Sequence, residues 1–162
     1  MIKLKLELSI DQYDSHNELS AEDRDLLMRA KKAADSAYAP YSNYYVGAAL
    51  LLENGEIITA NNQENAAYPS GLCAERIAMF YASSQYPDVA VKSLAISAKA
   101  KNFNIKSPVP PCGACRQTLS EYEVKQKNKI KIILMGETGK IQIIYGIETL
   151  MPLMFHADEL KK

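Results

Sequence analysis

Apolar and polar positions follow two different periods near the start of the chain. At Ile2–Leu8 they alternate one by one, which is the period of a β-strand with one buried face, and we predict an edge strand there. The polar stretch Asp11–Glu18 is typical of a loop. Apolar residues then recur at helical spacing, so we predict a helix from Ser20, whose side chain can cap it together with Asp23, to about Tyr38.

Two apolar runs, Val46–Leu52 and Glu56–Ala60, flank the dipeptide Asn54-Gly55. Both turn residues tolerate the positive φ of a tight turn, so we predict a β-hairpin. Further strands are predicted at Val91–Ala98, Ile130–Met135 and Ile141–Tyr145, and helices at Cys73–Gln85, from near Cys112 to between Glu121 and Val124, and at Ile147–Met151.

The order of these elements indicates an α/β protein. A helix and a hairpin come first and strands then alternate with helices, which favours one mixed sheet with helices packed on its faces. We expect five strands in this sheet. The 162 residues are enough for a single domain spanning 1–162, and residues 1–19 are interpreted as an N-terminal extension that carries an extra strand.

Charge and composition limit the kinds of molecule that the protein is expected to bind. Lys and Arg (19) balance Asp and Glu (19), so no net positive field would gather a nucleic-acid backbone, and a small molecule is the expected substrate. The N-terminus has no continuous apolar run, which predicts neither a signal peptide nor a membrane span and favours a cytoplasmic protein. Three cysteines, an odd number, favour reduced thiols over a disulfide framework.

The three cysteines are the candidate metal ligands. Cys112 and Cys115 have the spacing at which two thiolates reach one metal, and Cys73 is available as a third ligand from elsewhere in the fold. Three protein ligands leave a tetrahedral Zn²⁺ with one open position, which distinguishes a catalytic zinc from a structural one.

Charged residues beside the cysteines fit a catalytic role. Glu75 is two residues after Cys73, close enough to handle protons without being a ligand. Zinc held by three thiolates carries excess negative charge, and Arg76 and Arg116 are the neighbouring cations that would compensate for it.

Each of these residues also has a simpler interpretation. The pair Cys112 and Cys115 alone would fit a redox site or half of a structural zinc site. Glu75 alone would fit a solvated helix position. The third cysteine beside Glu75, and the segment PCGACRQ around the pair, favour a catalytic zinc site.

Five segments together resemble the small, three-cysteine zinc cytidine deaminases of pyrimidine salvage. They are PYSNYYVGAAL from Pro40, ENAAY from Glu64, CAER from Cys73, PCGACRQ from Pro111 and LMPLMF from Leu150. The resemblance covers about residues 25–160 and implies a three-layer α/β/α sandwich. It also implies a homotetramer whose active sites are shared between subunits.

The resemblance also implies roles for individual residues. Cys73, Cys112 and Cys115 would bind zinc, and Glu75 would carry protons during hydrolytic deamination of the cytosine ring. The implied substrate contacts are Asn62 and Glu64 at the ribose hydroxyls and, around the base, Tyr44, Tyr68, Ala74 and Phe155.

Two departures from the family bear on the substrate. Tyr44 stands where the family usually has phenylalanine, and the loop Lys101–Pro110 is longer than expected. The main expectation is deamination of cytidine and 2′-deoxycytidine. The alternatives are a deaminase of a cytosine nucleoside antibiotic of the blasticidin S type, a polynucleotide cytosine deaminase, and an inactive structural zinc protein.

Overall fold

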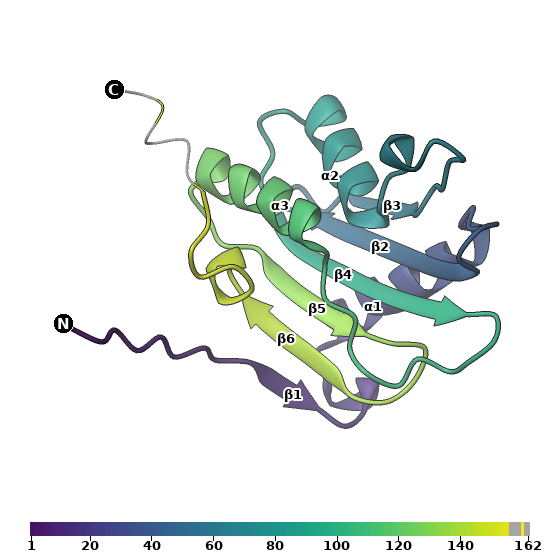
Figure 1. Cartoon of the computed structure of the whole chain (residues 1–162), viewed down its shortest axis with the longest axis horizontal. Coiled ribbons are helices and arrows are strands. Elements are labelled where there is room, and N and C mark those ends of the chain that lie inside the picture. Colours follow the sequence, from purple (N-terminus) through teal and green to yellow (C-terminus); the bar gives the residue numbers. More distant parts are fainter. Residues whose placement is uncertain (156–159, 161–162) are drawn as a thin grey trace.

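The computed structural model describes residues 1–155 and 160, and its centre is a six-stranded mixed sheet (Figure 1). The strand order is β1-β6-β5-β4-β2-β3; the β4–β5 pair is parallel and the other pairs are antiparallel. The strands are β1 (Asp11–Tyr13), β2 (Tyr44–Leu52), β3 (Ile57–Asn61), β4 (Val91–Ala100), β5 (Lys131–Met135) and β6 (Ile141–Tyr145). The helices are α1 (Ala21–Ala33), α2 (Ala74–Gln85) and α3 (Gly113–Gln126), with short 3-10 turns η1 (His16–Glu18), η2 (Ala34–Ser36), η3 (Tyr68–Ser70) and η4 (Ile147–Thr149).

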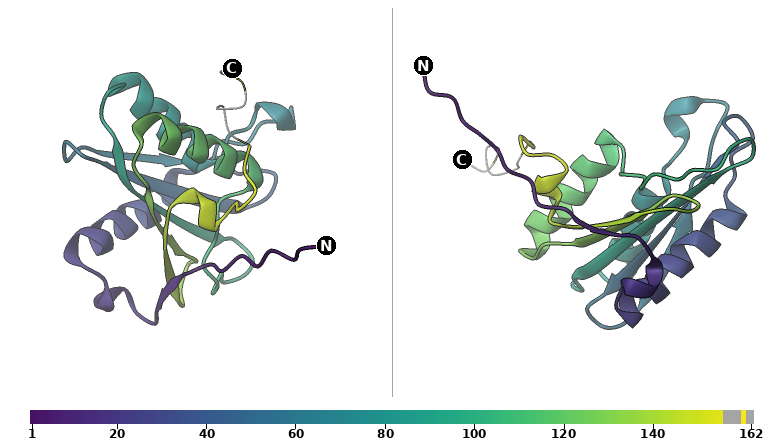
Figure 2. Two further views of the ribbon diagram at one scale, coloured as in Figure 1. Left: turned by 90° about the vertical axis from the view of Figure 1, so that its left-hand side faces the viewer. Right: turned by 90° about the horizontal axis from the view of Figure 1, so that it is seen from below.

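Helices cover both faces of the sheet. Helix α1 lies on one face, and α2 and α3 lie side by side on the other (Figures 1 and 2). This confirms the predicted α/β/α sandwich with a mixed sheet. The expected strand count of five is corrected to six, because β1 in the N-terminal segment is part of the sheet.

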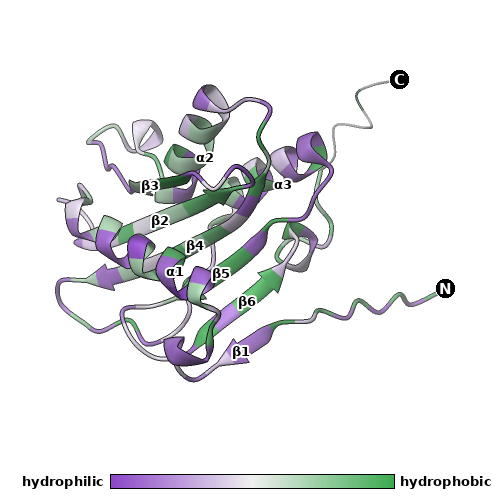
Figure 3. Ribbon diagram, turned by 180° about the vertical axis from the view of Figure 1, so that it is seen from behind, coloured by the Kyte–Doolittle hydropathy of each residue, from purple (hydrophilic) through white to green (hydrophobic). Residues whose placement is uncertain are grey.

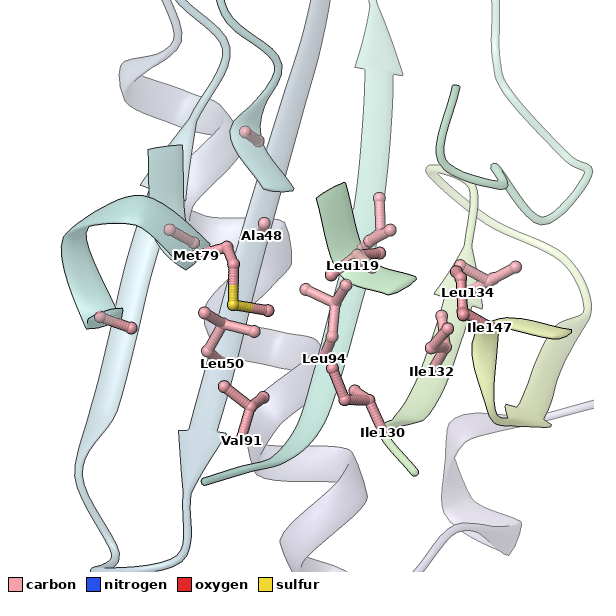
Figure 4. Packing of buried hydrophobic residues seen from close by; sticks show 14 of the residues in the cluster. Ala48, Leu50, Met79, Val91, Leu94, Leu119, Ile130, Ile132, Leu134 and Ile147 are labelled. Atoms are coloured by element: carbon pink, nitrogen blue, oxygen red, sulfur yellow. The ribbon is translucent and has the colours of Figure 1, made fainter. Parts of the chain in front are cut away.

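Alternating side chains of the central strands build a core on each face. In β5, Ile132 and Leu134 point towards α2 and α3, while Ile133 and Met135 point towards α1. Because β5 is buried on both faces, its sequence is a nearly continuous run of apolar residues. Figure 4 shows the first of these cores, in which side chains from α2 and α3 meet those of β2, β4 and β5.

The local signals for α1 and the hairpin are confirmed. The Ser20 hydroxyl accepts a hydrogen bond from the Asp23 N–H (3.1 Å) and donates one to the Asp23 carboxylate (2.8 Å). Helix α1 ends earlier than expected, at Ala33, and continues as the 3-10 turn η2. Gly55 adopts the positive φ (86°) that the turn between β2 and β3 requires.

The strand predicted at Ile2–Leu8 is wrong. Those residues have no strand pairing, and the strand lies instead at β1, within the stretch we expected to be a loop. β1 pairs with β6, and Tyr13 packs against the core under α1. Figure 3 shows why β1 gives a weak signal: it is hydrophilic along its length, while the inner strands are largely hydrophobic.

None of the described helices combines the length and apolar character needed to cross a bilayer; the longest, α3, has 14 residues.

Candidate metal centre and substrate cleft

Two helix N-termini bring the three cysteine sulfurs together. Cys73 is the N-cap residue of α2, Cys112 is the N-cap residue of α3, and Cys115 is in the first turn of α3, fully buried. The Sγ atoms of Cys73 and Cys112 are 3.8 Å apart, and those of Cys112 and Cys115 are 3.5 Å apart. All three lie within 4.8 Å of one another. Free N–H groups and the positive dipole ends of both helices therefore face the same sulfur cluster.

The spacing of the sulfurs fits a zinc ion. Sulfur ligands about 2.3 Å from a tetrahedral Zn²⁺ lie about 3.8 Å from one another, close to the observed separations. Neither N-cap cysteine uses its side chain to cap its helix, so both sulfurs are available to a metal. The three-cysteine set that the sequence predicted is thus assembled in space and leaves one tetrahedral position for water or substrate.

Charge in the cluster is concentrated on Cys73. The neighbouring Cys115 thiol lowers the pKa of Cys73 to about 5, and the adjacent Arg76 guanidinium adds to this effect. Because the proton stays on the partner, the pKa of Cys115 is raised. The buried Nε of Arg76 has no hydrogen-bond partner within the described part of the chain. Arg76 therefore lies where it can stabilise negative charge on the sulfurs.

Glu75 lies in the first turn of α2, next to the sulfur cluster, and only 5% of its surface is exposed. Burial raises the pKa of its carboxyl group, and negative charge on Cys73 contributes to the same shift. A buried carboxyl group beside a metal centre is suited to accepting and releasing protons.

A cleft of 760 Å³ opens over the sulfurs and Glu75. It is formed by the loop before β2, the end of β3, the segment before α2, and the loop before α3. Eight of the residues that we predicted for the site line this cleft: Tyr44, Asn62, Glu64, Tyr68, Cys73, Glu75, Arg76 and Cys112. Two of the three cysteines and four of the six expected substrate contacts thus share one cavity.

Glu64 organises one wall of the cleft. Its carboxylate accepts hydrogen bonds from the backbone N–H groups of Tyr41 (2.9 Å) and Ser42 (3.3 Å), and from the Ser42 hydroxyl. These bonds, that of the Ser42 side chain above all, lower the pKa of Glu64. An ionised carboxylate at this position can accept further hydrogen bonds from hydroxyl groups in the cleft.

Asn62 joins the end of β3 to the start of β2. Its side-chain oxygen accepts a hydrogen bond from the Val46 N–H (2.7 Å), and its amide nitrogen donates one to the Tyr44 carbonyl oxygen (3.0 Å). The side chain is therefore held in place at the cleft wall, and among residues 1–155 and 160 its second N–H and second lone pair have no partner.

The aromatic residues differ in their positions. Tyr44 is half-buried in the cleft, and burial raises the pKa of its hydroxyl. The Tyr68 ring packs edge-on against Tyr41, with centroids 6.0 Å apart, and is 74% exposed. Phe155 is exposed outside this cleft; its carbonyl oxygen accepts a hydrogen bond from the Gln117 side chain (3.1 Å).

Two further predicted residues do not reach the cleft with their side chains. The Ala74 methyl group is fully buried in the core beneath α2, so a substrate contact from Ala74 would have to come from its backbone. Arg116 donates hydrogen bonds to the carbonyl oxygens of Pro111 (2.8 Å) and Leu150 (2.6 Å). Its guanidinium group thus connects the loop before α3 to the C-terminal segment.

The sequence analysis missed several lining residues. Ser42, which bonds Glu64, lies inside the segment PYSNYYVGAAL, but the sequence could not show that its hydroxyl meets a carboxylate 22 residues away. Val109 and Pro110 come from the long loop before α3. The length of that loop was the one signal that it could shape access to the site.

The family comparison agrees with this geometry. Residues 20–129 match the family model described as "Cytidine and deoxycytidylate deaminase zinc-binding region". The matched range includes the three cysteines, Glu75 and the Asn62–Glu64 segment.

Relatives that align over nearly their whole length and a solved structure indicate the same family. A cytidine deaminase of Halalkalibacterium halodurans is 40% identical over 85% of this chain and 98% of its own length, and one of Sporosarcina psychrophila is 46% identical over 83% and 92%. The crystal structure of cytidine deaminase from Burkholderia pseudomallei superposes with a TM-score of 0.72 at 32% identity, over 85% of this chain and 100% of that chain. The chain therefore belongs to the family of cytidine and deoxycytidylate deaminases that share this zinc-binding region.

Proposed function

We propose that this protein is a zinc-dependent hydrolase that converts cytidine and 2′-deoxycytidine to uridine and 2′-deoxyuridine with release of ammonia. The observation that carries the proposal is the buried Glu75 beside three converging sulfurs at the base of a single cleft. The family match supports the same reaction, because relatives that align over nearly their whole length are cytidine deaminases.

Glu75 would move the protons of the reaction. Its carboxylate accepts a proton from the attacking water and delivers it to N3 of the cytosine ring as C4 gains the oxygen. It then takes the proton of the hydroxyl group formed at C4 and gives it to the exocyclic nitrogen, so that the C4–N bond breaks, C4 becomes a carbonyl and ammonia leaves. Zinc held by the three sulfurs supplies the Lewis acidity that makes water a nucleophile at neutral pH.

Residues of the cleft walls would orient the nucleoside. Glu64 is ionised and Asn62 is fixed by two backbone hydrogen bonds, so both present acceptors or donors to ribose hydroxyls without reorganisation. Tyr44 would pack against the base. A negative Glu64 at the sugar would repel a 3′-phosphate, which favours a free nucleoside over a polynucleotide.

We also infer that the protein works as a homotetramer with shared sites, in pyrimidine salvage in the cytoplasm. The exposed position of Phe155, away from the cleft of its own chain, supports a contact with a neighbouring copy. Arg76 would offset the charge of the metal thiolates in each site.

The test is the fall in ultraviolet absorbance as cytidine becomes uridine, measured for zinc-loaded wild type and Glu75→Gln. We expect the variant to keep its zinc and to lose at least about 100-fold in kcat, because proton transfer by a positioned side chain contributes that much. Equal rates for the two proteins would remove Glu75 from the mechanism. If fully zinc-loaded wild type converts neither cytidine nor 2′-deoxycytidine, the substrate assignment is wrong.

A further inference from the structure

The N-terminal arm, residues 1–10, leaves the sheet at β1 and extends beyond the body of the molecule (Figures 1 and 2). Its aliphatic side chains occupy alternate positions and are exposed to solvent: Ile2 (88%), Leu4 (89%), Leu6 (62%), Leu8 (54%) and Ile10 (43%). The arm precedes the family match, which begins at residue 20. It is therefore additional to the proposed deaminase site, and its role is independent of that proposal.

The arm has the residue pattern of a β-strand, but it pairs with no strand in the part of the chain that the structure describes. In an extended chain, alternate side chains share one face, so the five aliphatic residues form an apolar row and the charged residues form the opposite row. The side chains of Lys5 and Glu7 are 84% and 80% exposed, and their hydrogen bond is to each other. The arm runs directly into β1, so a strand that pairs with it would extend an existing sheet.

We propose that the arms of two copies of this chain pair with each other as antiparallel strands about a two-fold axis at Leu6. In this register Ile2 faces Ile10, and Leu4 faces Leu8. Leu6 faces its own copy, so all five aliphatic residues of one arm meet aliphatic residues of the other on one face. On the opposite face, Lys5 of each chain meets Glu7 of its partner.

The charges select this register over its neighbours. A shift of two residues in one direction sets Lys5 against Lys5, and a shift of two in the other direction sets Glu7 against Glu7. Each shift also leaves one end of the aliphatic row without an aliphatic partner. A shift of one residue would place the two apolar rows on opposite faces. The arm is thus complementary to itself in both hydrophobicity and charge.

A cysteine scan of the full-length, zinc-loaded protein tests the two-fold axis. The variant Leu6→Cys puts two thiols directly opposite each other, within disulfide range for either type of antiparallel pair. The matched control Leu4→Cys separates its two thiols by four residues along the strands, about 14 Å. On mild oxidation and non-reducing electrophoresis, we expect the Leu6→Cys dimer to form at least about tenfold faster than the Leu4→Cys dimer, with wild type as the baseline.

Charge reversal in the Leu6→Cys background tests the register between chains. Adding Lys5→Glu makes positions 5 and 7 both acidic, and adding Glu7→Lys makes them both basic, so each protein alone should cross-link slowly. Mixed one to one, the acidic and basic arms should pair and restore rapid cross-linking to a heterodimer. Equal rates for Leu6→Cys and Leu4→Cys would overturn the proposal, as would a mixture that cross-links no faster than its components.

Discussion

Two arginines that directly follow predicted site residues, Arg76 after Glu75 and Arg116 after Cys115, have different partners in this protein. The Arg76 guanidinium lies beside Cys73 and Cys115, where its charge helps to lower the pKa of Cys73. Arg116 instead bonds the carbonyl oxygens of Pro111 and Leu150. The sequence alone predicts the same charge-compensating role for both arginines, because each is adjacent to a site residue. The structure distinguishes them by the direction in which their side chains point.

Replacing Arg76 by Gln should therefore affect catalysis more than stability. We expect kcat/KM for cytidine to fall about 10–100-fold, the usual effect of removing a group that supports metal ligands, while zinc content measured by elemental analysis stays close to that of wild type. Arg116→Gln is the matched control: it should lower the free energy of unfolding by about 1–3 kcal/mol, because two carbonyl oxygens lose a charged donor, and leave kcat/KM less affected. The reverse pattern would contradict our assignment of the two side chains.

Among the secondary-structure elements, those with strong local signals were the most predictable. Asn54-Gly55 specifies the hairpin, Ser20 with Asp23 specifies the start of α1, and the order of strands and helices specifies the sandwich. The position of β1 was not predictable in this way. Its three residues are polar at two positions and owe their strand conformation to pairing with β6, a contact more than 120 residues away in sequence.

The same distinction applies to the site. The pairs Cys73 with Glu75 and Cys112 with Cys115 were predictable from their short spacings, and the resemblance to the deaminase family brought the two pairs into one site. The carboxylate of Glu64 bound to Ser42, and the entry of Val109 and Pro110 into the cleft, depend on how separate loops meet. Contacts between separate loops leave no local sequence pattern from which they could be predicted.

Helix α1 packs directly onto β2 at Gly47. A Cβ atom built there would lie 2.0 Å from the Ala30 carbonyl oxygen and 2.6 Å from the Ala34 nitrogen, both backbone atoms. Gly47→Ala should therefore push α1 away from the sheet and lower the free energy of unfolding in urea by about 3 kcal/mol. Gly113→Ala, where a Cβ meets no atom within 4 Å, should change it by less than about 1 kcal/mol. Equal losses of unfolding free energy for the two variants would show that α1 can move away from β2 at little cost.

The carboxyl group of Glu123 connects α3 to the segments on either side of the β5–β6 hairpin. It accepts hydrogen bonds from the N–H groups of Ile130 (2.8 Å) and Ile147 (3.0 Å), and burial raises its pKa above the ordinary 4.5. The folded protein thus holds this proton more tightly than the unfolded chain, so the stability contributed by Glu123 is greatest below about pH 4.5 and falls as the pH rises through the raised pKa.

Urea midpoints measured at a series of pH values test this linkage. The stability of wild type relative to Glu123→Gln should decrease as the pH rises above 4.5, because the amide does not titrate. Glu121→Gln, at an exposed position of the same helix, is the matched control and corrects for the charge change. A stability difference that grows with pH would have the wrong sign for a partly buried carboxyl group whose pKa is raised.

At the scale of the whole molecule, the proposed metal centre would connect the two helices on one face of the sheet. The three cysteines that could hold the ion lie at the N-termini of α2 and α3, and several of the other cleft residues come from the β2–β3 hairpin and the loops beside it. Binding of zinc should therefore stabilise the folded protein as a whole as well as supply its chemistry.

Removal of zinc by a chelator should abolish cytidine turnover and lower the melting temperature. At free zinc about 1,000 times its dissociation constant, binding contributes about 4 kcal/mol, which corresponds to about 8–16 °C for a chain of this length. Thermal melting before and after chelation, followed by zinc replacement, measures the effect; Ca²⁺ replacement is the control. An unchanged melting temperature would show that the ion does not connect the helices.

The separation of the ligands along the chain has a consequence for the order of folding. Cys73 precedes β4 and Cys112 follows it, and closing the 39-residue connection between them without an ordered sheet costs chain entropy. Leu94 and Ile96 of β4 pack in the core shared by α2 and α3, so the two helix ends meet once β4 has joined its neighbours. We therefore expect the rate at which a refolding chain captures zinc to be limited by how fast the middle of the sheet assembles.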